Sequence, residues 1–200
     1  MEITDPEVCG LINWVRNIVS ENQVNTSVHL TIRGPYRDSD PEIAKEDVDK
    51  WFSVLNKEAF FIGNIGLFNN EDEYVVYFKV GHPYLQKIWW KPDYPIREYG
   101  FNPHISLYTG KDRIFATELV RFLKNEKIEL MCDQYRLITY TPKQNDLFQI
   151  QNTEKTHPLN LVNTKKVSIT LFDRLSKFVQ EQRKIQRELP LSHENLRSWH

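Results

Sequence analysis

The chain has 200 residues and a formal net charge of −1, and 40% of its residues are hydrophobic and 12% aromatic. This length and composition fit one compact domain with a sizeable core, and they argue against a wholly disordered chain. The nearly neutral charge excludes a basic surface that binds nucleic acid regardless of its sequence.

The cysteines and the N-terminal residues indicate in which cellular compartment the protein is expected. Cys9 and Cys132 form neither a C-x-x-C pair nor a cluster of metal-ligand type. Two isolated thiols suit a reducing compartment. The first residues lack the basic and apolar regions of a signal peptide, and no run approaches the ~20 apolar residues of a membrane span. We therefore expect a cytoplasmic protein without membrane association.

The first half of the chain is predicted to alternate helices and strands. Asp5 and Pro6 mark a helix start, because aspartate is a good N-cap and proline fits the first helical position. Apolar residues then recur at helical spacing, whereas the residues from Ser27 to Ile32 alternate as in a half-buried strand. In chain order we expect a helix, a strand, a helix and two strands at about 6–19, 27–32, 41–57, 59–68 and 74–80.

The second half continues this mixed pattern. We expect a short helix, an ordered loop, a strand, a helix and three strands at about 82–90, 91–103, 104–108, 112–125, 127–131, 135–141 and 147–151. This order is typical of an α+β domain over residues 1–151. Residues 152–200 form an extension with an amphipathic helix at about 167–189. Packing of this helix on its own domain is favoured over pairing with a second copy, so we expect a monomer.

Two of the six histidines have a hydroxyl residue two positions later and stand between aliphatic residues. The first motif is His29-Leu30-Thr31, and the second is His104-Ile105-Ser106. Because side chains alternate between the faces of a strand, each motif is expected to present an imidazole and a hydroxyl on one face.

Two such motifs could cleave a phosphodiester. One imidazole takes the proton of the attacking oxygen, the other gives a proton to the leaving oxygen, and Thr31 and Ser106 hydrogen-bond to the phosphoryl oxygens. The alternative is that each motif is an ordinary core strand with a satisfied histidine. A single His-x-Ser/Thr carries little information, whereas two matched copies among six histidines are far rarer by composition alone.

With these motifs, the chain resembles the 2H phosphoesterase superfamily over about residues 25–151. This superfamily includes 2′-5′ RNA ligases, cyclic phosphodiesterases and enzymes that degrade 2′-5′ or cyclic oligonucleotides. The resemblance implies a bilobal α+β fold, with pseudo-two-fold antiparallel sheets around a central cleft and the motifs facing across it. It also implies phosphate ester cleavage without a metal or other cofactor. The N-terminal helix and the C-terminal helical extension lie outside the minimal fold.

Several residues near the motifs are candidates for substrate binding. Arginines can hold phosphates and aromatic rings can stack on bases. The candidates are Arg33, Tyr36 and Arg37 directly after the first motif, Trp90 before the second, and Tyr108, which is expected on the face of His104 and Ser106. The alternative for each is a solvated turn or a packing aromatic. The other four histidines show no metal-ligand spacing, so no metal site is expected.

The sequence thus predicts a metal-independent phosphodiesterase that acts on RNA-type phosphate esters: a 2′,3′-cyclic phosphate, a 2′-5′ linkage or a cyclic oligonucleotide. Which histidine is the base is left open, as is ligation in place of hydrolysis. Two other classes of protein are weighed against this one. The first is a module that binds nucleotides or RNA ends without turnover, and the second is an interaction protein that acts through its C-terminal helix.

Overall fold

The computed structural model describes residues 1–20, 27–32, 50, 53–55, 58–70, 73–88, 101–136 and 169–188. The chain divides into two compact units, Met1–Lys166 and Val167–His200. The first unit is an α+β structure with two antiparallel sheets, and the described part of the second is one helix.

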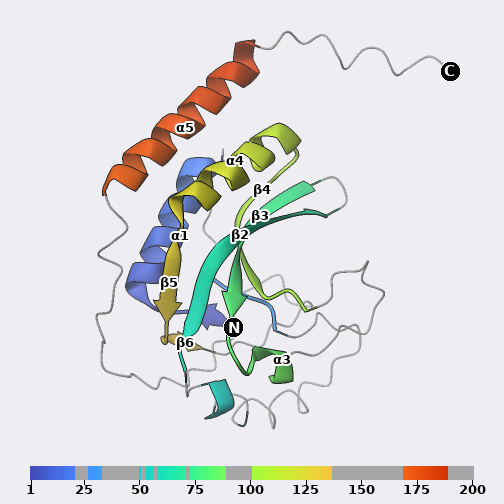
Figure 1. Cartoon of the computed structure of the whole chain (residues 1–200), viewed down its shortest axis with the longest axis vertical. Coiled ribbons are helices and arrows are strands. Elements are labelled where there is room, and N and C mark those ends of the chain that lie inside the picture. Colours follow the sequence, from blue (N-terminus) through green and yellow to red (C-terminus); the bar gives the residue numbers. More distant parts are fainter. Residues whose placement is uncertain are drawn as a thin grey trace, which may run out of the picture. The chain divides into compact units, whose positions relative to one another are not determined.

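The larger sheet has four antiparallel strands in the order β4-β3-β2-β5. Their bounds are β2 Phe60–Asn70, β3 Glu73–Gly81, β4 His104–Gly110 and β5 Glu129–Cys132. Figure 1 shows that β2 is long and strongly curved, so that the sheet curls. The β2–β3 register shifts between Gly63 and Ile65, around Asn64 with a φ of 49°. A bulge of this kind bends the strand and increases its twist.

The smaller sheet pairs β1 (Glu2–Ile3) with β6 (Tyr135–Arg136). The first motif extends this sheet on the other side of β1, through an antiparallel bridge between Glu2 and His29. Two backbone hydrogen bonds support the bridge: Ile3 N donates to Val28 O at 2.8 Å, and Leu30 N donates to Met1 O at 2.9 Å. The predicted strand at 27–32 is therefore a short extended segment beside β1, and β1 itself was not expected.

Two helices pack against the larger sheet. Helix α1 (Pro6–Val19) contacts β4, and helix α4 (Arg113–Glu126) contacts β2, β3 and β4. Each helix starts at an aspartate cap. The Asp5 carboxylate accepts from the backbone N–H groups of Glu7 and Val8 at 2.9 and 3.0 Å, and Asp112 accepts from Phe115 N at 2.9 Å. These bonds satisfy N–H groups that have no partner within the first helical turn.

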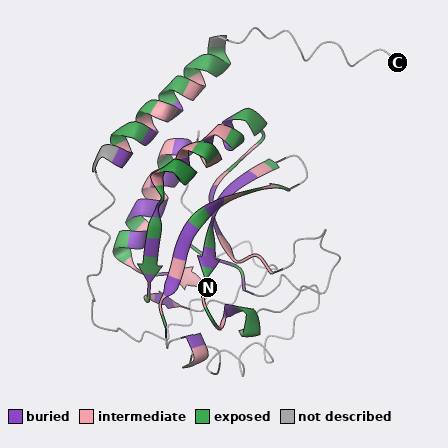
Figure 2. Ribbon diagram, viewed as in Figure 1, coloured by how far each residue is buried: buried purple, intermediate pink, exposed green. Residues whose placement is uncertain are grey.

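The core lies between these helices and the strands (Figure 2). It is built from aliphatic residues of α1 and α4 and from alternate residues of β2, β3 and β4. Fully buried members include Ile12, Phe60, Ile62, Phe78, Ile105 and Leu119. Because Ile105 and Leu107 face this core, His104 and Ser106 face the other way, and both are partly exposed.

Most of the predicted elements in the described ranges are confirmed. Helices α1, α4 and α5 (Ile169–Glu188) and strands β2 to β5 lie where periodicity placed them, within a few residues. The expected short helix after β3 is α3, a single turn at Leu85–Ile88. Of the helix expected at 41–57, only residues 50 and 53–55 are described, and they are helical. Among the described helices, none is long and apolar enough to cross a membrane.

Helix α5, the described part of the second unit, is amphipathic. Leu171, Leu175 and Val179 recur every four residues, and most of the other positions are charged or polar. The remainder of the predicted extension, and the strand expected at 147–151, lie outside the described residues.

Candidate active site

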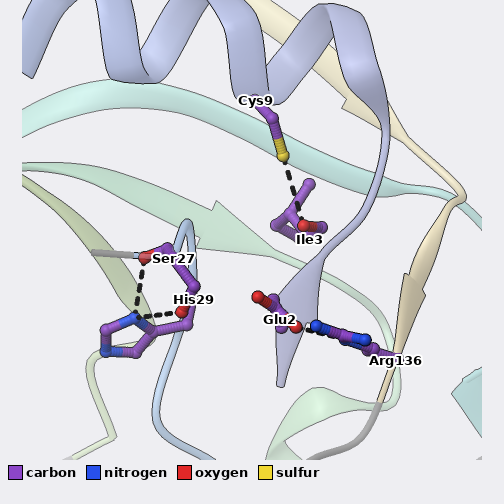
Figure 3. Close-up of polar contacts among 6 residues, drawn as sticks. All are labelled: Glu2, Ile3, Cys9, Ser27, His29 and Arg136. Atoms are coloured by element: carbon purple, nitrogen blue, oxygen red, sulfur yellow. Dashed lines mark hydrogen bonds and ion pairs between the residues drawn. The ribbon is translucent and has the colours of Figure 1, made fainter. Parts of the chain in front are cut away.

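The first motif presents His29 and Thr31 on the surface. Val28, Leu30 and Ile32 are buried, whereas His29 and Thr31 between them are exposed, as the alternation in the sequence predicts. Nδ1 of His29 lies 3.0 Å from the carbonyl O of Ser27 and 3.5 Å from its Oγ. Figure 3 shows the His29 ring folded back against Ser27 and pointing away from the Glu2–Arg136 ion pair.

The second motif holds its histidine in the same way. Nδ1 of His104 lies 2.7 Å from the carbonyl O of Asn102, which again is the residue two positions earlier. A carbonyl oxygen only accepts, so Nδ1 carries the proton in both histidines. The neutral ring then has its lone pair on Nε2. Within the described part of the chain, neither Nε2 has a hydrogen-bond partner, so both are free to accept or donate a proton.

His82 provides a contrast within the same molecule. Its Nδ1 accepts from Tyr84 N at 3.2 Å, and its Nε2 lies 3.1 Å from the carbonyl oxygens of both Leu55 and Glu58. The His82 ring also stacks on Phe60, with the centroids 4.3 Å apart. Both ring nitrogens therefore have partners, and His82 is a structural histidine with the opposite tautomer to His29 and His104.

A buried arginine of α1 joins the two motifs. Arg16 is 3% exposed. Its Nε donates to the carbonyl O of Ser106 at 2.9 Å, and its Nη1 donates to the carbonyl O of Ser27 at 3.2 Å and to Asn13 Oδ1 at 3.3 Å. One guanidinium thus contacts the backbone of both motif segments. The Ser27 carbonyl is shared between Arg16 and the His29 ring. Burial lowers the pKa of Arg16 from its ordinary value.

Aromatic rings surround His104 on the exposed face of the sheet. The centroid of its ring lies 5.1 Å from that of Tyr77 and 5.2 Å from that of Phe68, and the Phe68 contact is edge-to-face. The Tyr77 hydroxyl accepts from Asn102 Nδ2 at 3.4 Å. Since Asn102 also holds Nδ1 of His104, this aromatic cluster restricts the orientation of the ring.

The hydroxyl residue of each motif is at least partly exposed, like the histidine two positions before it. Thr31 is exposed beside His29, and Ser106 is partly exposed beside His104. Ser106 is the cross-strand partner of Tyr77, and His104 is that of Lys79. Directly opposite residues share a face of the sheet. A lysine, a tyrosine, an imidazole and a hydroxyl therefore gather on one patch of the larger sheet.

Tyr108 does not join this patch. The β3–β4 register shifts between Val76 and Tyr77, so that Tyr108 pairs with Val76 while Ser106 pairs with Tyr77. The strict alternation that placed Tyr108 beside Ser106 is interrupted there. The Tyr108 ring instead lies 5.0 Å from that of Phe115 of α4. Tyr108 is thus a packing residue, and the expectation that it lies at the site is corrected.

The other substrate-side candidates are not placed. Arg33, Tyr36, Arg37 and Trp90 lie outside the described residues, and their proposed roles stay predictions. Among the described residues, His, Cys, Asp and Glu side chains form no group of three that could hold a metal ion.

Three contributors to the site were missed from the sequence. Arg16 and Tyr77 fall within the predicted helix at 6–19 and the predicted strand at 74–80, and Asn102 falls within the predicted loop at 91–103. No motif in the sequence singles them out as site residues. A polar residue at a position where the helical period calls for burial was a signal for Arg16. No local pattern indicated the contacts of Tyr77, because they join different strands.

A comparison with models of known protein families gives no match, and neither does a comparison with curated proteins. The geometry of the site and the sequence motifs therefore carry the functional argument.

Proposed function

We propose that the protein is a metal-independent phosphodiesterase in which His29 and His104 are the general acid and base. One Nε2 removes the proton of the attacking hydroxyl or water, and the other protonates the leaving oxygen. Thr31 and Ser106 donate hydrogen bonds to the non-bridging oxygens, which gain charge during attack. The two imidazoles supply both proton transfers, so the reaction as proposed needs no metal ion.

The observation that carries the proposal is the matched tautomer of the two histidines. In each motif the main-chain carbonyl two residues earlier binds Nδ1, which leaves Nε2 available. A fixed tautomer is what an acid–base histidine requires, because only the other nitrogen then exchanges protons with the substrate. A histidine kept for packing has no such need, and His82 uses both nitrogens for main-chain contacts.

The attachment of both motifs to Arg16 supports a shared site. The Ser27 and Ser106 carbonyls contact one guanidinium, although 79 positions separate these residues in the sequence. The two motifs also come from two different sheets. We propose that these sheets are the two halves of a pseudo-two-fold 2H phosphoesterase fold, with the scissile phosphate between them.

For the substrate we propose an RNA-type phosphate ester: a 2′,3′-cyclic phosphate, a 2′-5′ linkage or a cyclic oligonucleotide. The chemistry fits all three, because each contains a phosphodiester that a hydroxyl or water can attack. We further propose that the protein works as a monomer in the cytoplasm, and that Tyr36, Arg33, Arg37 and Trp90 contribute to substrate binding.

The test is turnover of these three substrate types in the presence of EDTA. We expect His29→Ala and His104→Ala each to lower kcat about 10²- to 10⁴-fold, the range for loss of a general acid or base. Circular dichroism should show that both variants keep the fold, because the His29 side chain is exposed and that of His104 points away from the core.

The matched control is His82→Gln. This substitution removes main-chain contacts of a structural histidine, so it should lower the melting temperature while leaving the kcat of the folded enzyme within a few-fold. Turnover that survives both His29→Ala and His104→Ala would contradict the assignment. Binding of the substrates without any turnover would instead favour the non-catalytic nucleotide-binding module.

A further inference from the structure

A hollow with three lysines lies where the C-terminal end of α4 meets the larger sheet. It is lined by Asn64, Ile65, Lys79, Leu123, Lys124, Lys127, Ile128 and Glu129. These residues come from β2, β3, the C-terminal end of α4 and the start of β5. The three lysines are exposed, and the aliphatic members Ile65, Leu123 and Ile128 are buried. The hollow therefore has an apolar floor and a charged rim.

Among the described residues that line the hollow, positive charges outnumber negative ones. Three ammonium groups face one carboxylate, that of Glu129. In the described part of the chain, none of these lysines forms an ion pair. Lys124 and Lys127 lie at the C-terminal end of α4, where cations favourably offset the helix dipole. That role does not extend to Lys79, which belongs to the middle of the sheet.

The sheet register connects this hollow to His104. Lys79 is directly opposite His104 on β4, and on the other side it is opposite Gly63 of β2, which in turn is opposite Glu129 of β5. The row from His104 to Glu129 thus crosses all four strands. Directly opposite residues have Cβ atoms about 4.5–5.5 Å apart and share a face. Lys79, one of the three lysines that line the hollow, therefore lies one strand away from the proposed catalytic histidine.

We propose that this hollow binds a second phosphate of an oligonucleotide whose scissile phosphate lies at His104. Lys79 is close enough to His104 to contact the phosphate next to the scissile one, and Lys124 and Lys127 attract the chain beyond it. This inference rests on the proposed function, and it narrows the substrate class. An oligonucleotide is preferred over a mononucleotide that carries a single phosphate.

The test compares two substrates with the same reacting group: a mononucleotide 2′,3′-cyclic phosphate and a short oligonucleotide that ends in that group. The variants are Lys79→Gln, Lys124→Gln and Lys127→Asn, and asparagine is chosen because Lys127 has a φ of 49°. We expect Lys124→Gln and Lys127→Asn each to lower kcat/KM for the oligonucleotide by about 5-fold, with less than 2-fold change for the mononucleotide. Lys79→Gln, directly opposite His104, should lower kcat/KM for both substrates, and by about 5-fold more for the oligonucleotide. The dependence of log kcat/KM on log salt should become shallower by about one for each lysine removed.

Two matched control variants are expected to raise kcat/KM for the oligonucleotide or to leave it unchanged. Glu129→Gln removes the carboxylate of the rim, so it should raise kcat/KM for the oligonucleotide alone. Lys111→Gln changes an exposed lysine outside the hollow and should affect neither substrate. Equal effects of the lysine variants on both substrates, or none on either, would overturn the inference.

A binding measurement separates this inference from the proposed function. Fluorescence anisotropy with a labelled, non-cleavable oligonucleotide needs no turnover. The wild-type protein could bind this probe without cleaving any substrate, while the lysine variants bind it several-fold more weakly. That result would confirm the phosphate-binding role of the hollow and show that the catalytic proposal is wrong. If cleavage is confirmed but the variants bind the probe as tightly as the wild type does, the phosphate-binding role of the hollow is wrong and the proposed catalytic function stands.

Discussion

At the scale of single residues, Arg16 is the side chain on which the geometry of the proposed site depends. It holds the carbonyl that accepts from His29 Nδ1 and also holds the backbone at Ser106. It touches neither Nε2, so it is a positioning residue. Arginine suits this role because its planar group donates in several fixed directions, which a lysine cannot reproduce.

Replacing Arg16 should disturb His29 more than His104. We expect Arg16→Lys to keep the fold but to lower kcat by about 10-fold or more, because misplacement of an acid–base group is costly. Arg16→Met removes one donor from each of the Ser27 and Ser106 carbonyls and should also cost about 1–3 kcal/mol of stability.

The measurement for this prediction is the ¹⁵N shift of the imidazole nitrogens, which reports the tautomer. Loss of the Nδ1–H form at His29 is expected in Arg16→Lys, whereas His104 serves as the internal control, because its Nδ1 is held by Asn102. An unchanged tautomer at His29 together with unchanged kcat would show that Arg16 acts only in stability.

At the scale of elements, β2 and β3 depend on the absence of a side chain at Gly66. A Cβ atom there would lie 2.2 Å from Cζ of Tyr77 and 2.5 Å from its hydroxyl. Gly66 and Tyr77 are directly opposite in the β2–β3 register, so the tyrosine ring lies across the glycine. This packing fixes the ring that contacts His104.

Gly66→Ala should therefore affect both stability and the site. We expect a loss of about 1–3 kcal/mol in the free energy of unfolding, as overpacking typically costs, measured by urea denaturation. Turnover should also fall, because the Tyr77 ring must move against His104. The control is Gly10→Ala in α1, where a Cβ would meet no atom within 4 Å. That change should stabilise the helix by up to about 1 kcal/mol. Equal effects of both substitutions would contradict this account.

At the scale of the whole molecule, the buried thiol of Cys132 and the half-buried thiol of Cys9 should make stability depend on alkaline pH. Burial raises the pKa of Cys132 from 9.0 to about 12, and burial followed by the nearby Asp5 and Glu2 raises that of Cys9 to about 11. Their Sγ atoms donate to the carbonyl oxygens of Gln134 and Ile3 (Figure 3 shows the Cys9 contact). The folded chain thus holds both protons at pH values where the unfolded chain releases them.

The sign of the effect follows from these raised pKa values. The stabilisation is complete below about pH 9 and is lost as pH rises toward 11 and 12. For Cys132 alone the loss amounts to about 2 kcal/mol by pH 10.5. Urea denaturation between pH 8 and 10.5, with a reductant present, should show a steeper decline for the wild type than for Cys132→Ala. Parallel declines would mean that Cys132 does not titrate differently in the folded and unfolded states.

Much of the fold was decided by local sequence. The caps Asp5 and Asp112, the helical periodicity of α1, α4 and α5, and the apolar runs of β2 and β3 were enough to place these elements, because each depends on residues within a few positions. The pairing of His29 with Thr31 and of His104 with Ser106 also follows from the sequence. In an extended segment with aliphatic neighbours, alternation alone turns the polar residues outward.

Tertiary structure decided which contacts link these pieces to one another. The contacts of Arg16 with Ser27 and Ser106, and the row from His104 through Lys79 to Glu129, join residues far apart in the chain. The two-residue strand β1 could not be predicted from the sequence, because it is defined only by its pairing with β6 on one side and with the first motif on the other. Tyr108 was misplaced for the same reason: a register shift depends on the neighbouring strand. In a regular strand or helix, local pattern specifies which way a side chain points, whereas long-range packing determines its contacts and any shift in register.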